Sequence, residues 1–280
     1  MVSGALQIAI LARELSAEKR IIERVQVNLP FPMLVKNLTG ITDLGLQPEI
    51  YFDAMTLDTL SREEVRRASE ELQRKNIPVT FHAPFMDLSP GAVDRKIREV
   101  TALRFNQVIE LVPAFHPQAI VFHGGYDKWR FDGDVSLWLE NSLLTWKPLV
   151  VWAETLSVRL ALENVFEEDP SILKALLDTL DSPYLGYCLD SGHGNLFSAV
   201  PVGEWIEALG SRLIEVHLHD NHRQADEHLP IGFGEIDFDG LFSSLRAKNL
   251  HPIHTVEPHA EEDLLPSLRA LGKFLQENKK

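Results

Sequence analysis

The sequence lacks the features that mark several large classes of protein. Its 280 residues include one cysteine, Cys188, so an internal disulfide is excluded and a reducing compartment is favoured. Cys188 lies in the strand-like run 184–189, which predicts a buried apolar residue rather than a nucleophile. No apolar run approaches the roughly 18 residues of a membrane span. The run 5–12 has no preceding positive region, so we expect no signal peptide and a cytoplasmic location.

Positive charge is also scarce. Lys and Arg number 27 against 41 Asp and Glu, which gives a formal net charge of −14. Binding along a nucleic acid requires many Lys and Arg to neutralise phosphates, so the composition disfavours a nucleic-acid partner. There is no Gly-x-Gly-x-x-Gly after the first strand and no Walker sequence, so no motif supports a nucleotide-binding fold. The composition is compatible with a small metabolite held by a metal.

From residue 25 onward, short apolar runs alternate with longer segments of helical period. The runs predict eight strands, at 25–31, 49–53, 79–82, 119–123, 160–165, 185–190, 213–218 and 253–257. Helices are predicted at 61–75, 90–115, 135–157, 170–180, 202–209, 238–248 and 261–277. Eight strand-helix pairs without a flexible linker favour a single α/β domain, a (β/α)8 TIM barrel over 25–280, rather than an open doubly wound sheet.

Residues 1–24 precede the first predicted strand and are interpreted as an N-terminal extension packed on the barrel. Leu6, Ile10, Ile21 and Ile22 favour a helix that covers one end of the domain, although 6–11 is also compatible with a strand. An exposed layer of helices is compatible with a homodimer.

Residues that bind metals recur where the predicted strands end. Six successive strands end in such a residue, namely His82, His123, Glu163, Asp190, His217 and Glu257, and further ones follow in the loops, among them His193, Asp226 and His228. The carboxyl ends of barrel strands meet at one rim, so these side chains are expected to converge there. A lone histidine or glutamate at a strand end is more often structural, but six in succession predict a metal site. Nitrogen and oxygen donors without thiolate suit Zn, Mn, Fe, Co or Ni equally.

The densest part of this pattern is 212–234, where twelve positions include His217, His219, Asp220, His222, Asp226 and His228. His217 is the strand-end residue, and Asp226 with His228 is the pair that would complete a site for several ions. We interpret His219 and His222 as loop or supporting residues, with Asp220 orienting a neighbouring imidazole.

The motifs HAPF, VFHGG, LALENV, LDSGH, HLHDN and DEHLPIGFGEIDF resemble the xylose isomerase-like TIM barrel superfamily over 25–275. The superfamily holds sugar isomerases and epimerases and also endonuclease IV. In the endonuclease IV branch nine side chains bind three metals, mostly zinc, and the resemblance places all nine residues given above at those positions. In the sugar branch one divalent metal is held by two glutamates, an aspartate and a histidine, here Glu163, Glu257, Asp190 and His217. Both patterns are complete, so the resemblance implies one to three ions.

Two enzymatic chemistries follow from this resemblance. The first is isomerisation or epimerisation of a small sugar or sugar phosphate, in which Glu163 and Glu257 remove and return a proton beside a carbonyl that a metal polarises. His193 would orient the substrate. Three aromatic residues are either pocket walls or, more simply, core residues: Phe85, Trp129 and Trp152.

The second chemistry is metal-dependent hydrolysis of a phosphodiester in abasic DNA, as in endonuclease IV. Against it stands the absence of basic residues from the segments HAPFMDLSPG and LENVFEED. Lys128, Arg130 and Arg223 suit one small phosphate or surface ion pairs better than a duplex. A barrel that binds a metal or polyol without turnover is a third, non-enzymatic reading. We favour the sugar isomerase or epimerase.

Overall fold

Eight parallel strands form a closed barrel in the structure, a computed structural model that describes Leu15 and residues 18–276. The strands are β1 (Gln26–Pro30), β2 (Gln47–Tyr51), β3 (Thr80–His82), β4 (Ala119–His123), β5 (Arg159–Glu163), β6 (Leu185–Asp190), β7 (Leu213–Leu218) and β8 (Ile253–Val256). Each strand pairs with the next in chain order, and β1 pairs with β8 to close the ring. The predicted (β/α)8 barrel and its eight strands are confirmed.

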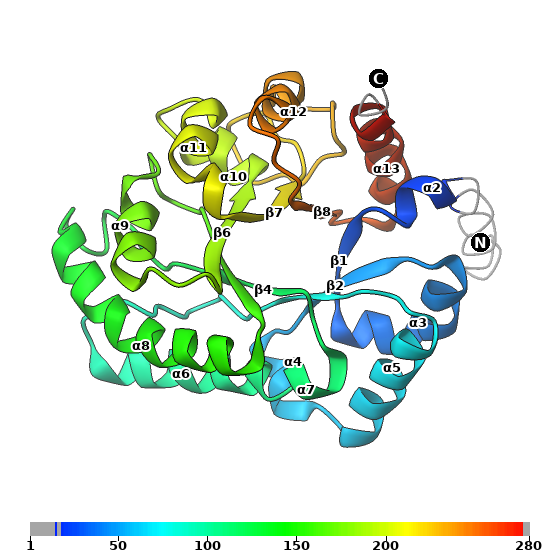
Figure 1. The fold of residues 1–280 in the computed structure, drawn as a ribbon, viewed down its shortest axis with the longest axis horizontal. Helices are drawn as coiled ribbons and strands as arrows, with labels where there is room; N and C mark the ends of the chain where they lie inside the picture. The colour runs from blue at the N-terminus through cyan, green and yellow to red at the C-terminus, as the bar shows by residue number, and fades with distance from the viewer. Residues whose placement is uncertain (1–14, 16–17, 277–280) are drawn as a thin grey trace.

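Helices surround the barrel as an outer layer (Figure 1). They are α2 (Lys19–Ile22), α3 (Phe31–Leu44), α4 (Ala54–Thr59), α5 (Arg62–Arg74), α6 (Arg95–Ile109), α7 (Val112–Phe115), α8 (Val135–Leu156), α9 (Ser171–Leu180), α10 (Ser191–Phe197), α11 (Val202–Leu209), the 3-10 turn η1 (Gly210–Arg212), α12 (Phe238–Ala247) and α13 (Glu261–Gln276). None of the described helices is long and apolar enough to cross a membrane.

Helix α5 shows how the sequence sets these elements. The Ser61 hydroxyl accepts a hydrogen bond from the Glu64 backbone N–H at 3.1 Å and so caps the helix. Glu63 and Glu64 lie in the first turn, where the helix dipole favours negative charge. Ala68 and Leu72 are buried on the barrel side. The helix predicted at 61–75 is confirmed.

The helix predicted at 90–115 is wrong at its start and is interrupted near its end. Asp94 caps α6 by accepting from the Lys96 backbone N–H at 2.7 Å, so the helix begins at Arg95. Gly91 lies in the preceding turn, where a Cβ would come within 2.4 Å of the Ser142 hydroxyl. A second short helix, α7, follows a break at 110–111. Three further helices, α3, α4 and α10, were not predicted.

Side chains in the barrel interior lie in layers because alternate residues of a strand point to the same side. The upper layer lies at the carboxyl ends of the strands and holds the predicted site. Two residues earlier on the strands, a half-ring of fully buried polar side chains lies below it, namely Glu49, Thr80, Glu215 and Thr255. The other half of this lower layer is apolar and includes Val121, Ala161 and Cys188. Cys188 is buried and free, as predicted.

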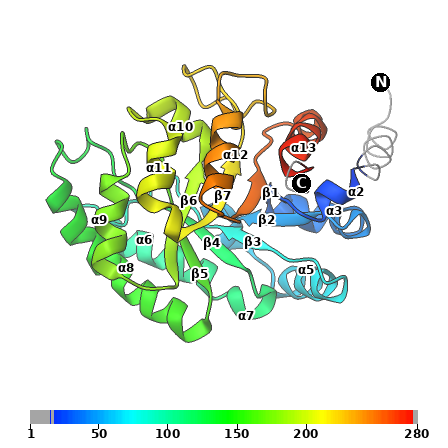
Figure 2. The same ribbon diagram turned by 45° about the horizontal axis from the view of Figure 1, so that its top comes forward.

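The described part of the N-terminal extension packs on α13. Figure 2 shows α2 beside α13. Arg24 Nη1 donates to the Leu275 carbonyl at 3.2 Å, and Arg269 Nε donates to Glu18 Oε1 at 2.9 Å. Ile21 and Ile22 are buried within α2. The predictions for Leu6, Ile10 and 6–11 lie outside the described residues, and the boundary between 24 and 25 stays a prediction.

Candidate metal centre

Three carboxylates from three strands face one nitrogen of His217. The Nδ1 atom of His217 lies 3.2 Å from Glu257 Oε1, 3.6 Å from Glu163 Oε1 and 3.9 Å from Asp190 Oδ2. All four side chains are buried, with His217 and Asp190 at 0% exposure. The structure therefore brings together the four residues that the sugar branch of the resemblance requires.

The His217 Nδ1 atom has no hydrogen-bond partner, although it is buried among these oxygens. A buried ring nitrogen without a partner is costly, and a carboxylate-lined position is one where a cation is favourable. The residues present therefore fit a divalent metal held by one nitrogen and several oxygens. The donor set of Glu163, Asp190 and His217 has its ligand atoms within 4.8 Å of one another.

A second group of possible ligands surrounds the other oxygen of Glu163. His82 Nε2 lies 3.1 Å and His123 Nε2 lies 3.2 Å from Glu163 Oε2. Burial alone would lower the pKa of His82, but the hydrogen bond and the charge of Glu163 raise it to about 9. Glu163 is thus placed to belong to two groups of donors at once.

A third group lies over the β7 side of the mouth. His228 Nε2 lies 3.1 Å from Asp226 Oδ2, and His193 Nε2 lies 3.4 Å from the same oxygen. His219 also belongs here, because its ligand atom groups with those of Asp226 and His228. All nine predicted residues therefore lie at one end of the barrel, in three adjoining groups.

The loop that carries Asp226 and His228 is held from within by Asp220. Its carboxylate accepts backbone N–H groups of Gly232 and Gly234 at 2.9 Å and of Ile236 at 3.1 Å. The prediction that Asp220 orients an imidazole is wrong, because these donors occupy its oxygens. Asp220 instead folds the loop back over the mouth, so that His228 Nδ1 reaches the Glu257 carbonyl at 3.0 Å.

His219, which was predicted to be a loop or supporting residue, lies against the candidate ligand Asp190. It is buried, its Nε2 lies 3.1 Å from both oxygens of Asp190, and its Nδ1 has no hydrogen-bond partner. Its ring stacks on His228 with centroids 3.8 Å apart. His222 is exposed and pairs with Glu227, in agreement with a loop role. His217 was identified because it lies at the end of a strand. That pattern does not give the side-chain direction of His219, which lies just past the same strand.

The turn between β6 and α10 joins two of the donor groups. Asp190 caps α10 by accepting the His193 backbone N–H at 2.6 Å, so one carboxylate both starts the helix and faces the site. The Asn164 side chain clamps this turn: its Nδ2 donates to the Asp190 carbonyl at 3.0 Å, and its Oδ1 accepts the Asp190 N–H at 2.9 Å. Gly192 is required because a Cβ there would meet the His219 ring at 1.9 Å.

The surroundings of Glu163 and Glu257 shift their pKa values in opposite directions. Burial alone would raise the pKa of Glu163, but the charges of His123 and His217 hold it well below its ordinary value. Burial and the nearby charges of Asp190 and Glu163 raise the pKa of Glu257 despite the attraction of His217. Environments that separate the pKa values of two carboxyl groups suit a base and an acid.

Two buried carboxyl residues, Glu49 and Glu215, were not among the predicted site residues. Glu49 Oε2 lies 3.2 Å from His217 Nε2, and Glu215 lies beside Glu49 in the lower layer. Burial and the charge of Glu49 raise the pKa of Glu215 to about 8. The signal was present, because Glu215 lies two residues before His217 and so faces the same interior.

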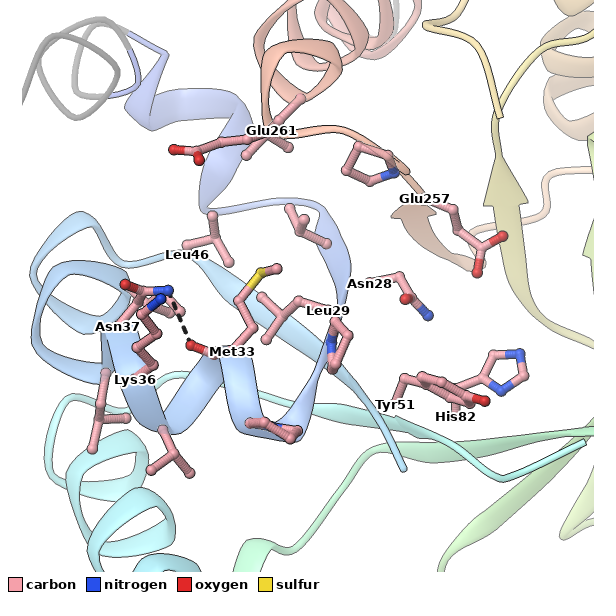
Figure 3. Close-up of a pocket in the computed structure, with 18 of the residues that line it drawn as sticks. Asn28, Leu29, Met33, Lys36, Asn37, Leu46, Tyr51, His82, Glu257 and Glu261 are labelled. Carbon is pink, nitrogen blue, oxygen red and sulfur yellow. Dashed lines mark hydrogen bonds between the residues drawn. The ribbon is translucent and has the colours of Figure 1, made fainter. Parts of the chain in front are cut away.

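A cavity of about 1710 Å³ opens from the site and continues outward along α3. Figure 3 shows Glu257, His82, Tyr51 and Asn28 toward the barrel, with Met33 and Lys36 at the other end. Tyr51 was not predicted to line it. Small-ligand pockets typically have ~300–1,000 Å³, so this cavity has room beyond a single sugar.

The three aromatic residues considered from the sequence have different roles. Phe85 lines the cavity and stacks on His123 with ring centroids 4.3 Å apart. Trp129 is 85% exposed and belongs to neither the cavity lining nor the core. Trp152 is half-buried against the core. Of these three aromatic residues, only Phe85 therefore lines the cavity.

Two of the three cations near the mouth are engaged within the protein. Lys128 pairs with Glu168, and Arg223 Nε donates to Asn195 Oδ1 at 3.0 Å. The Lys128 contact is a surface ion pair of the kind that the sequence suggested, whereas Arg223 contacts a neutral amide, and neither cation lines the cavity. Four other cations, Lys36, Arg66, Arg67 and Arg74, line the cavity, and of these Arg66 and Arg74 pair with glutamates.

Comparisons with known proteins agree with this architecture. The family described as "xylose isomerase-like TIM barrel" matches residues 47–277. An uncharacterized protein of Methanocaldococcus jannaschii is 30% identical over 226 residues, which cover 78% of this chain and 76% of that protein. The crystal structure of a D-tagatose 3-epimerase-like protein superposes with a TM-score of 0.77 at 27% identity, covering 90% of this chain and 97% of that one. A Thermus thermophilus protein, soaked with ZnCl2, gives a TM-score of 0.71 at 25% identity, covering 92% and 100%.

Proposed function

Because the chain belongs to the xylose isomerase-like TIM barrel family, we propose that it is a divalent-metal-dependent sugar isomerase or epimerase acting on a small sugar or sugar phosphate. The observation that carries the proposal is the placement of Glu163 and Glu257 against the same nitrogen of His217, at 3.6 and 3.2 Å. Two carboxylates on either side of one ligand position are what a proton transfer to and from a sugar carbon requires.

Glu163, Asp190, His217 and Glu257 would hold the ion, and the remaining predicted ligands provide for a second and third ion. A bound divalent ion would polarise the sugar carbonyl and stabilise the negative charge that develops on its oxygen. Glu163, the more acidic carboxyl, accepts the proton next to the carbonyl. Glu257, which holds a proton more readily, returns one from the other side. His193, between Asp190 and Asp226, orients a substrate hydroxyl.

The cavity supports this reading. Its polar end at His82, His123 and Glu257 suits hydroxyl groups, and Phe85 and Tyr51 offer faces for the apolar side of a sugar ring. The similarity to a D-tagatose 3-epimerase-like protein at 27% identity points to the same class of substrate.

The proposal is tested by incubating metal-loaded protein with a panel of ketoses and aldoses, free and phosphorylated, and separating the products by chromatography. We expect conversion of at least one sugar to its isomer or epimer. Metal content is measured separately, before and after loading. A protein that neither carries nor takes up a transition metal would contradict the proposal.

Hydrolysis of abasic DNA is the second candidate, because three adjoining donor groups are present rather than one. An oligonucleotide with one abasic site belongs in the same panel. Cleavage of that strand without conversion of any sugar would reverse the order of the two candidates.

A further inference from the structure

Glu49 is a fully buried carboxylate directly beneath the candidate metal centre. It lies on β2, two residues before Tyr51, and its Oε2 is 3.2 Å from Nε2 of His217. The opposite ring nitrogen, Nδ1, faces the oxygens of the metal site and has no hydrogen-bond partner. The two nitrogens of His217 therefore have different surroundings.

The position of Glu49 is itself fixed by a second contact. Asn28 Nδ2 donates to Glu49 Oε1 at 2.7 Å. Figure 3 shows the Asn28 side chain on the barrel side of the cavity. Both oxygens of Glu49 are thus engaged, one by Asn28 and one by His217, so the carboxylate has little freedom to turn away from the ring.

Glu215 is equally buried but does not share this role. Its nearest oxygen, Oε1, is 4.0 Å from His217 Nε2, which is too long for a hydrogen bond. The same oxygen accepts hydrogen bonds from the Thr255 hydroxyl and, at 3.4 Å, from the Thr80 hydroxyl. Oε1 of Glu215 is therefore held by Thr255 and Thr80, and of these two carboxyls only Glu49 lies within hydrogen-bond distance of the His217 ring.

We propose that Glu49 is a positioning residue that fixes His217 in the tautomer with its proton on Nε2. A neutral imidazole carries one proton, so a proton held on Nε2 by Glu49 leaves a lone pair on Nδ1. That lone pair then points at Glu163, Asp190 and Glu257, where a metal would bind. A carboxylate behind a metal-binding histidine also raises the basicity of the ring. The inference rests on the proposed metal site, but not on the identity of the substrate.

The test is titration of metal-stripped protein with Co²⁺ against a competing chelator, following both affinity and the visible absorption of the bound ion. In Glu49→Leu the acceptor is lost, and Co²⁺ affinity is expected to fall roughly 10- to 100-fold. Glu49→Gln keeps an acceptor oxygen and is expected to lie between Glu49→Leu and the wild type. The matched control is Glu215→Gln, which alters an equally buried carboxyl and is expected to keep wild-type affinity and absorption.

A purely structural role for Glu49 would leave the Co²⁺ absorption unchanged, whereas loss of the His217 orientation alters it. Wild-type affinity in Glu49→Leu, or an equal loss in Glu215→Gln, would overturn the proposal. If Glu49→Leu does not fold, the comparison of Glu49→Gln with Glu215→Gln decides in the same way. A wild-type protein that binds Co²⁺ but converts no sugar leaves this inference standing and removes only the proposed reaction, whereas a wild type that binds no Co²⁺ overturns both.

Discussion

His228 Nε2 and Asp226 Oδ2 lie 3.1 Å apart at the end of a loop that Asp220 folds over the barrel mouth. The pair is set apart from the group at His217, so it tests how many ions the site holds. His228→Ala is expected to lower the metal content by about one ion per chain if several ions bind, and to leave it unchanged if one binds. His222→Ala, which removes an exposed imidazole of the same loop, is the control. Elemental analysis of dialysed protein provides the measurement.

Removing either proposed catalytic carboxylate should abolish turnover. General acid and base groups contribute roughly 100- to 10,000-fold, so Glu163→Gln and Glu257→Gln are each expected to lower kcat by that order. The control is Glu168→Gln, an exposed carboxyl of the loop after β5. Circular dichroism checks that the variants fold. Wild-type rates in both variants would show that the paired-carboxylate mechanism is wrong.

Gly192 is expected to tolerate no side chain. In Gly192→Ala the new Cβ would lie 1.9 Å from His219 Cε1, so the ring must leave its position beside Asp190. We expect a loss of about 1–3 kcal/mol in the free energy of unfolding and weaker metal binding. Gly194→Ala provides a control in the same helix, because its Cβ meets only Asn164 Nδ2, at 3.8 Å. Equal stability of the two variants in urea would contradict this account.

Glu167 predicts a pH dependence of stability. The group is 2% exposed, and burial raises its pKa from 4.5 to about 7. Between these two pH values the folded state holds a proton on Glu167 that the unfolded state releases. The stability associated with protonated Glu167 is therefore fully present below pH 4.5 and is lost as the pH rises through 7. Glu167→Gln replaces the titrating carboxyl with a neutral amide, so the pH-dependent loss of stability disappears. In metal-free protein, the variant should gain about 3 kcal/mol relative to wild type between about pH 4 and about pH 8, measured by urea unfolding. A constant difference between the two proteins across this range would show that Glu167 titrates normally.

The fold was predictable because most strands are short runs rich in apolar or β-branched residues, and eight such runs alternating with helices favour a closed barrel. Helix α3 was missed because it follows β1 without a polar loop and contains residues of low helix propensity such as Thr39 and Gly40. Helix α10 was missed because Asp190 serves both as a strand end and as its cap.

The candidate site was predictable where a residue ends a strand, because strand ends converge whatever the surrounding packing. Glu49 and Glu215, below the rim, were missed because they lie inside strands, where only the alternation of side chains indicates that they face the same interior as His217. The ring direction of His219 was not predictable because it depends on contact with Gly192, which is far from it in sequence. These contacts are tertiary and leave no local pattern.

The most direct test of the proposed function is hydrogen exchange during turnover in D2O. Metal-loaded protein is incubated with ketohexoses, including D-tagatose, and deuterium is followed by NMR. The account predicts deuterium at the carbon next to the carbonyl of a sugar that is converted, and loss of that exchange in both Glu163→Gln and Glu257→Gln. If fully metal-loaded protein incorporates no deuterium into any sugar of the panel, the proposed proton-transfer function is contradicted.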